Sequence, residues 1–202
     1  MAQHTSDSIE RTALELLRQA GALSAPVDLD KVVAALGAKV HHETLEDEVS
    51  GVLIVKGGEK HVLVNAAHHP NRQRFTIGHE LGHLVLHDGQ GDRLIIDKQI
   101  RVYQRVGEAT SGAYSAPGSI TKPYEEREAN MFAAALLMPA PLVQHAALEH
   151  DLGDELDITA LAKTFGVSEQ AMFIRLQQLG VVEVALGKSS ATRDDAQLSL
   201  TV

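Results

Sequence analysis

The sequence predicts an α+β fold that is mostly helical and contains a small antiparallel sheet. Helical patterns of apolar residues occupy both ends of the 202-residue chain, and a stretch rich in β-branched residues lies between them. Apolar residues make up 44% of the chain, which is enough for a buried core. Aromatic residues make up only 3%, so we expect a core of Leu, Val, Ile and Ala.

Two helices are expected before the strands. The first covers residues 7–20, and Gly21 follows it as a C-terminal glycine. Its buried face is formed by Ile9, Ala13, Leu16 and Leu17. The second helix begins at Asp28, whose side chain can cap it, and ends at Gly37.

Three short strands are expected at residues 38–42, 50–55 and 60–65. The last two are rich in β-branched side chains, and Gly57 and Gly58 between them can adopt the positive φ angles of a hairpin turn. We therefore expect an antiparallel sheet, and the hairpin could offer an edge strand to an extended peptide segment.

The rest of the chain is expected to be mainly helical. Residues 71–88 and 125–139 form long helices, and residues 158–180 form two short helices around Gly166. Residues 90–122 are less regular. Their segment RLIIDKQIRVYQR has strand character, but no element is assigned to it.

Composition and charge narrow the classes of function. The net charge of −9 disfavours nonspecific attraction to nucleic acid or to anionic membranes. The sequence has no cysteine, so a metal ion would have to be bound by His and carboxylate ligands. It shows neither a secretory leader nor an apolar run long enough to span a membrane, so we expect a cytoplasmic protein.

The segment RFTIGHELGHLVLHDG carries the motif HExxH on one of the expected helices. Residues at i and i+4 share a helix face, so His79 and His83 can bind one Zn²⁺ ion. Glu80 is turned about 100° around the helix axis, so it approaches the water that such an ion would bind. There it can act as a general base. Gly78 and Gly82 predict the close approach of another backbone. A surface helix that carries these residues by chance is the alternative.

His87 extends the same stripe of histidines by one more turn. Residues eight apart are separated by about 12 Å along a straight helix, so His87 cannot share an ion with His79. We expect His87 to support the site from outside the ligand shell or to be structural.

A third ligand is expected from a carboxylate on another helix. The segment EEREAN, which begins the expected helix 125–139, offers Glu125, Glu126 and Glu128. The apolar residues that follow predict a buried helix, in which an inward carboxylate needs a cation or protons. Asn130 lies one turn after Glu126, where it could hydrogen-bond a ligating imidazole. An exposed acidic helix start remains an alternative for Glu125.

Several ordered motifs resemble the ImmA/IrrE-type metallo-endopeptidases, which are gluzincin-like proteases. Over residues 10–180 these motifs are PVDLDKVVAALGAKV, SGVLIV, RQRFTIGHELGHLVLH, EREANMFAAALLMP and LAKTFGVSEQAMFIRLQQLG. The resemblance implies a zincin-like metallopeptidase domain over 7–145. A helix-turn-helix-like segment packed on it is expected over 146–186, and a flexible tail over 187–202. The Gly/Ala/Ser-rich loop 111–119 and the tail have no counterpart in these motifs.

The resemblance also implies a ligand set and a catalytic residue. The two His of HExxH and the first Glu of ExxAN correspond to His79, His83 and Glu126, and Glu80 is the catalytic carboxylate. The expected metal is Zn²⁺, although Mn²⁺ or Fe²⁺ also bind His and carboxylate ligands.

The implied function is cleavage of a protein, with a helix-turn-helix repressor as the expected substrate in stress, mobile-element or toxin–antitoxin regulation. Tyr103 or Tyr124 could stabilise the oxyanion, and the sequence does not select between them. One alternative is a metal-responsive DNA-binding regulator, but residues 149–180 carry six acids and two bases. The other alternative is a pseudo-protease that binds a repressor without cutting it.

Overall fold

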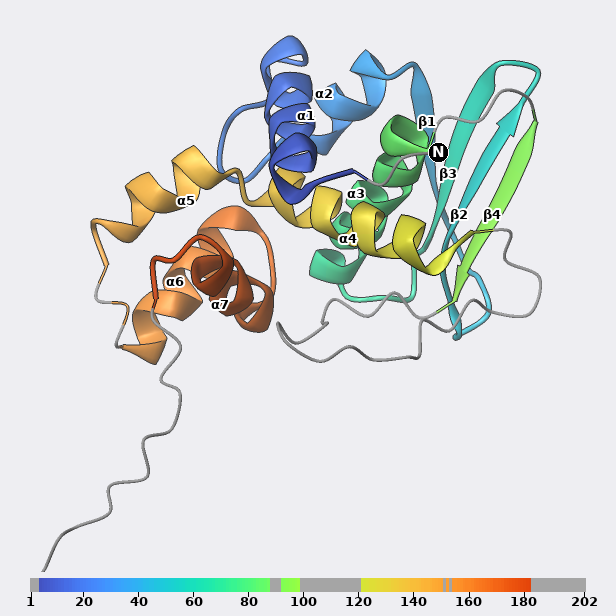
Figure 1. The fold of residues 1–202 in the computed structure, drawn as a ribbon. Coiled ribbons are helices and arrows are strands. Elements are labelled where there is room, and N and C mark those ends of the chain that lie inside the picture. Colours follow the sequence, from blue (N-terminus) through green and yellow to red (C-terminus); the bar gives the residue numbers. More distant parts are fainter. Residues whose placement is uncertain (1–3, 88–91, 99–120, 151, 153, 183–202) are drawn as a thin grey trace, which may run out of the picture.

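A computed structural model describes residues 4–87, 92–98, 121–150, 152 and 154–182 (Figure 1). The elements in chain order are α1 Ser6–Gln19, α2 Leu29–Ala35, β1 Ala38–Glu43, β2 Val49–Lys56, β3 Glu59–Asn65, α3 Pro70–Leu86, β4 Arg93–Lys98, α4 Pro123–Leu137, α5 Ala140–Ala147, α6 Glu155–Phe165 and α7 Glu169–Gln178. Helices predominate and the strands form one small sheet, so the predicted α+β class is confirmed.

Local capping explains where several helices begin. The side chain of Asp28 accepts a hydrogen bond from the backbone N–H of Lys31, as expected for the cap of α2. Ser168 caps α7 in the same way, through the N–H of Ala171. Gly166 ends α6 with a left-handed φ of 65°, which glycine adopts without steric cost.

The sheet is mixed rather than purely antiparallel, because its strand order is β1-β3-β2-β4. The turn at Gly57 and Gly58 pairs β2 with β3 in antiparallel fashion, as predicted. The chain also reverses between β1 and β2, so β1 and β3 run in the same direction and pair in parallel. Hydrophobic patterns identify strands but not their order, and the prediction of an antiparallel sheet was wrong for this pair.

The fourth strand, β4, determines which strands lie at the edges of the sheet. β4 pairs with β2, and the strand character predicted within residues 90–122 is confirmed for Arg93–Lys98. Both strands of the hairpin therefore have neighbours on both sides. The expectation that the hairpin 50–65 offers an edge strand was wrong, and within the described residues the sheet ends at β1 and β4.

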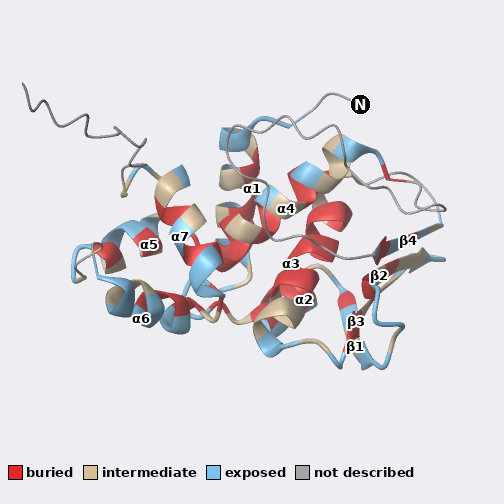
Figure 2. Ribbon diagram, turned by 90° about the horizontal axis from the view of Figure 1, so that it is seen from below, coloured by how far each residue is buried: buried red, intermediate tan, exposed pale blue. Residues whose placement is uncertain are grey.

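Helix α3 lies between the sheet and the other helices, and it is buried along most of its length (Figures 1 and 2). It packs against β2 and β3 on one side and α4 on the other. A Cβ atom built on Gly82 would lie 2.9 Å from the Cα atom of Ala129, and one built on Gly78 would lie 3.3 Å from that of Ala133. The close backbone approach predicted from these glycines is therefore present between α3 and α4.

Helices α5, α6 and α7 lie on the side of the helical region away from the sheet (Figure 1). Arg175 of α7 is buried, and it donates hydrogen bonds to Glu10 of α1 and to the backbone carbonyl of Met138. Asn71 of α3 bonds the carbonyl of Val167 in the α6–α7 turn. The predicted division at 145/146 falls inside α5 and stays a prediction, while the tail 187–202 lies outside the described residues. None of the described helices is both long and apolar enough to cross a membrane.

Candidate metal centre

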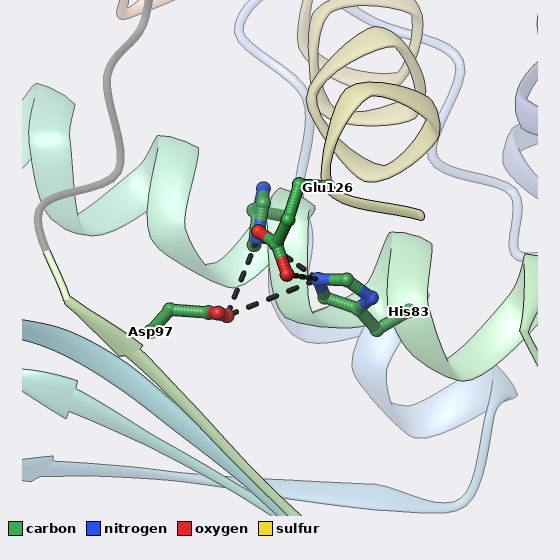
Figure 3. A group of neighbouring side chains, drawn as sticks. His83, Asp97 and Glu126 are labelled. Carbon is green, nitrogen blue, oxygen red and sulfur yellow. Dashed lines mark hydrogen bonds and ion pairs between the residues drawn. The ribbon is translucent and has the colours of Figure 1, made fainter. Parts of the chain in front are cut away.

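Elements α3, β4 and α4 bring together four side chains of types that can bind a metal ion, which we call the metal-binding cluster (Figure 3). They are His79 and His83 from α3, Asp97 from β4 and Glu126 from α4, and their donor atoms all lie within 4.8 Å of one another. The two Nε2 atoms of the histidines are 3.0 Å apart. His79 Nε2 lies 3.3 Å from Asp97 Oδ2 and 3.3 Å from Glu126 Oε2, and His83 Nε2 lies 3.5 Å from Glu126 Oε1.

Local sequence explains this convergence. His79 and His83 are one helical turn apart, so their rings leave the same face of α3. Glu126 lies in the first turn of α4, which approaches α3 closely through Gly82. Figure 3 shows Glu126 extending from α4 and Asp97 from β4 toward His83. The metal-binding cluster therefore forms only when α3, α4 and β4 are packed in these relative positions.

Each histidine of the cluster has a partner on its other ring nitrogen. His79 Nδ1 lies 2.9 Å from Asn130 Oδ1, so the imidazole donates to this amide oxygen and keeps its Nε2 lone pair for the cluster. His83 Nδ1 lies 3.2 Å from His87 Nδ1, which accepts the same kind of bond. Both Nε2 atoms thus point into one small space, where a proton or a metal ion can lie between them.

His87 and Glu128 continue the hydrogen bonds that begin at His83. If His87 accepts at Nδ1, its proton lies on Nε2, which is 2.9 Å from Glu128 Oε2. The other oxygen of Glu128 accepts a hydrogen bond from the backbone N–H of His4 at 2.8 Å. The structure thus places His87 beside the cluster rather than within it, and gives Glu128 a position behind His87.

Glu80 is completely buried beside the cluster. Among the described residues neither of its carboxylate oxygens has a hydrogen-bond partner, and the same is true of Asp97 Oδ2 and Glu126 Oε1. A Cβ atom built on Gly51 would lie 2.5 Å from Glu80 Oε1, so the glycine in β2 makes room for this carboxylate. A carboxylate buried without a donor is costly unless a cation or a proton compensates it.

The pKa values of His79, Glu126 and Glu80 show that the cluster favours positive charge. Burial by itself would lower the pKa of His79, but the carboxylates of Asp97 and Glu126 raise it to about 10. Burial would raise the pKa of Glu126, yet its close contacts with the imidazoles of His79 and His83 lower it. Burial raises the pKa of Glu80 well above its usual value, and the neighbouring charges of Asp97 and Glu126 add to this effect.

A divalent metal ion fits these residues. Three carboxylates and two imidazole lone pairs converge in a buried space, and several of the carboxylate oxygens lack a donor within the described part of the chain. Nitrogen and oxygen donors of this kind suit Zn²⁺, and also Mn²⁺ or Fe²⁺. The geometry therefore supports a metal site without choosing among these ions.

The affinity for a metal ion should depend on pH. With a pKa of about 10, His79 is protonated at neutral pH in the metal-free protein, so metal binding must release that proton. Because His79 must lose a proton before it binds the ion, the affinity for metal is low at low pH and increases as the pH rises toward this pKa. We expect the Kd for Zn²⁺ to fall about tenfold per pH unit between about pH 7 and 9. Competition with a chromophoric chelator measures this, and a Kd independent of pH would contradict it.

Three other residues that the sequence offered as site candidates are not part of the metal-binding cluster within the described residues. The carboxylate of Glu125 accepts a hydrogen bond from the Lys122 N–H at the start of α4, although its side chain is only 15% exposed and does not lie at an exposed helix start. The hydroxyl of Tyr124 lies 3.3 Å from Lys122 Nζ, and no described contact joins it to the cluster. Tyr103 lies outside the described residues. The role of either tyrosine in binding an oxyanion stays a prediction.

Asp97 is the residue that sequence reasoning missed. It lies in RLIID, the segment to which no element was assigned. In β4 the side chains of Leu94 and Ile96 are exposed, whereas Ile95 and Asp97 are buried. This alternation would have placed a lone acid on the buried face of an otherwise apolar strand, which is the signal that could have revealed it.

Comparison with known proteins places the chain in a family. A family described as the IrrE N-terminal-like domain matches residues 33–177. The chain is 28% identical over 118 residues to the radiation response metalloprotease IrrE of Deinococcus radiodurans, an alignment that covers 54% of this chain and 31% of that relative. The chain thus spans about a third of the length of this curated relative.

A solved structure described as a Mycobacterium tuberculosis transcriptional regulator has a similar fold. Its TM-score is 0.54 and its sequence identity 20%, and the match covers 85% of this chain and 46% of that one. At this identity the likeness concerns the fold alone. The family match covers more than half of the chain and includes α3 and α4, which carry three residues of the cluster. This chain therefore belongs to the family of IrrE N-terminal-like domains.

Proposed function

We propose that the protein is a metal-dependent endopeptidase, with Zn²⁺ as its metal ion. The observation that carries this proposal is the convergence of His79, His83 and Glu126 beside the buried carboxylate of Glu80. Membership in the family of IrrE N-terminal-like domains supports the same activity. His79, His83 and Glu126 would hold the ion, and Glu80 would act on water.

Peptide hydrolysis requires proton transfers that this site can perform. A bound divalent ion supplies Lewis acidity, which activates water and polarises the scissile carbonyl. Glu80 takes a proton from the attacking water and returns it to the leaving amine. Burial raises the pKa of the Glu80 carboxyl, and a bound cation beside it would favour the carboxylate form that accepts the proton. Asn130 and His87 keep the two imidazoles in one orientation.

The proposed substrate is a helix-turn-helix repressor, cleaved in the cytoplasm in a stress, mobile-element or toxin–antitoxin setting. This part of the proposal rests on the resemblance of the sequence motifs to ImmA/IrrE-type proteases. The test is to incubate the protein with the product of a neighbouring repressor gene, with Zn²⁺ and with a chelator. Discrete fragments that form only with metal support the proposal, whereas stable binding without cleavage would indicate a pseudo-protease.

Glu126→Gln should weaken metal binding strongly. Replacing a charged ligand by a neutral amide is expected to raise the Kd for Zn²⁺ by at least about tenfold. The adjacent Glu125→Gln is a matched control, because Glu125 accepts a hydrogen bond at the helix start and lies outside the cluster. Isothermal titration with Zn²⁺ measures both variants. Equal affinities in the two variants would exclude Glu126 as a ligand.

Direct DNA binding receives no support from helix α7, which would be the recognition helix of a helix-turn-helix. Its single basic residue, Arg175, is buried and bonded to Glu10. The exposed part of α7 carries Glu169, Gln170 and Phe173, none of which attracts phosphate. We therefore favour a packing or substrate-recognition role for this helix pair.

A further inference from the structure

Asp97, which faces the metal-binding cluster, lies beside an irregularity in the sheet. Gly51 pairs with Asp97, but the next residue pair is Val49 with Lys98, so the register between β2 and β4 shifts at this point. The extra residue of β2 is Ser50. Bulges of this kind redirect nearby side chains and are common beside active sites. Here the bulge lies at the position where an acid on the inner face of β4 reaches His79.

Of the two distances from Asp97 to the histidines, one matches the distance expected within a coordination sphere and the other is slightly longer. Donor atoms about 2.0–2.2 Å from a tetrahedral ion are about 3.3–3.6 Å from one another. Asp97 Oδ2 lies 3.3 Å from His79 Nε2 and 3.9 Å from His83 Nε2. The pairs formed by Glu126 with the same two nitrogens measure 3.3 and 3.5 Å. Asp97 thus stands in nearly the same geometric relation to the histidines as Glu126 does.

The carboxylate of Asp97 faces the two histidines, where an imidazolium or a metal ion can supply the positive charge beside it. Its side chain is 5% exposed, and Oδ2 accepts no hydrogen bond from the described residues. A metal ion would compensate Asp97 as it compensates Glu126.

We propose that Asp97 is a fourth protein ligand of the metal ion, and that it closes the coordination sphere in the conformation described. The inference rests on the proposed metal site, and it adds a ligand that HExxH and ExxAN do not contain. Four protein ligands are typical of structural zinc sites, whereas catalytic sites keep one position open. Hydrolysis then requires Asp97 to leave the ion or the ion to accept a fifth ligand. Because β4 is an edge strand with only β2 as its neighbour in the described sheet, it can move at lower cost than an inner strand.

The test compares Asp97→Asn with Asp92→Asn in Co²⁺-loaded and Zn²⁺-loaded protein. Asp97→Asn keeps the size of the side chain while removing its charge, and Asp97→Ala serves as a second variant. Asp92 lies just before β4 and accepts a hydrogen bond from the Gly57 N–H, which an asparagine oxygen can also accept, so Asp92→Asn is a matched control. Azide added to the Co²⁺ protein reports an open coordination position through the visible absorption bands.

With Asp97 as a ligand, azide leaves the Co²⁺ bands of the wild-type and Asp92→Asn proteins unchanged and shifts those of both Asp97 variants. The Kd for Zn²⁺ rises by at least about tenfold in Asp97→Asn and stays within about twofold of wild type in Asp92→Asn. An azide shift in the wild type equal to that in Asp97→Asn, or unchanged Zn²⁺ affinity in Asp97→Asn, overturns the proposal.

The same experiment separates this inference from the proposed function. If Co²⁺ binds in a manner that depends on Glu126 but azide already reaches it in the wild type, only the role of Asp97 is wrong. If the wild type binds neither Co²⁺ nor Zn²⁺, the metal site is wrong, and both the inference and the proposed function fail with it.

Discussion

Glu80→Gln is expected to abolish peptide hydrolysis while leaving metal binding intact. Glutamine has the same shape as glutamate and fits the space beside Gly51, but it cannot accept the proton of the attacking water. General acid–base catalysis contributes about 10²–10⁴-fold, so we expect a rate loss of that order. Fragment formation followed on gels gives the rate, and elemental analysis gives the metal content.

The control for this variant is Glu125→Gln, which removes the same charge from the neighbouring helix without touching the cluster. It should cleave at the wild-type rate. If Glu80→Gln cleaves as fast as this control, Glu80 is not the general base. If it loses its metal as well as its activity, the carboxylate has a structural part in the site that the proposed mechanism does not assign to it.

Gly82→Ala is expected to destabilise the protein, although alanine is the better helix former. In an exposed helix interior this change would stabilise by about 1 kcal/mol. Here the new Cβ atom would lie 2.9 Å from Ala129 Cα and 3.1 Å from Ala129 O, so α3 and α4 must separate. Overpacking of this kind costs about 1–3 kcal/mol. Urea unfolding measures the free energy, and Zn²⁺ affinity should fall as well, because Ala129 lies between Glu126 and Asn130.

Gly78→Ala is the matched comparison on the same helix face. Its Cβ atom would meet Ala133 at 3.3 Å, a contact that small shifts can relieve. We expect a smaller loss of stability than in Gly82→Ala, and little change in Zn²⁺ affinity, because Ala133 lies nearly one turn beyond Asn130. A gain of stability in Gly82→Ala equal to the helix-propensity difference would show that the two helices are not in close contact there.

The sequence predicted the parts of the site that lie on a single helix. The spacing of His79, Glu80 and His83 is enough to place them on one turn of α3. Spacing alone left Glu125, Glu126 and Glu128 as equal candidates, and the structure gives each a different partner: a helix start, the metal-binding cluster and His87. Which of three acids faces a neighbouring helix depends on packing, which periodicity does not report.

Features that depend on tertiary pairing were harder to predict. The strand residues of β1, β2 and β3 were identified, but their order in the sheet was not, since one hydrophobic pattern is compatible with several pairings. Asp97 was missed for the same reason. The alternation in RLIID indicates a buried acid, but that this acid lies beside His79 depends on the pairing of β4 with β2.

The hydrogen bonds that run from Glu128 through His87 to His83 also provide a spectroscopic signal. The ring N–H protons in such buried bonds are shielded from solvent, so they should exchange slowly and give resolved proton resonances far downfield in an NMR spectrum. If a metal ion binds His83 Nε2 as proposed, it should polarise both bonds, and the resonance nearer to the ion should shift more than the one farther from it. The protein therefore carries its own internal reporter of metal occupancy, which can be read without any substrate.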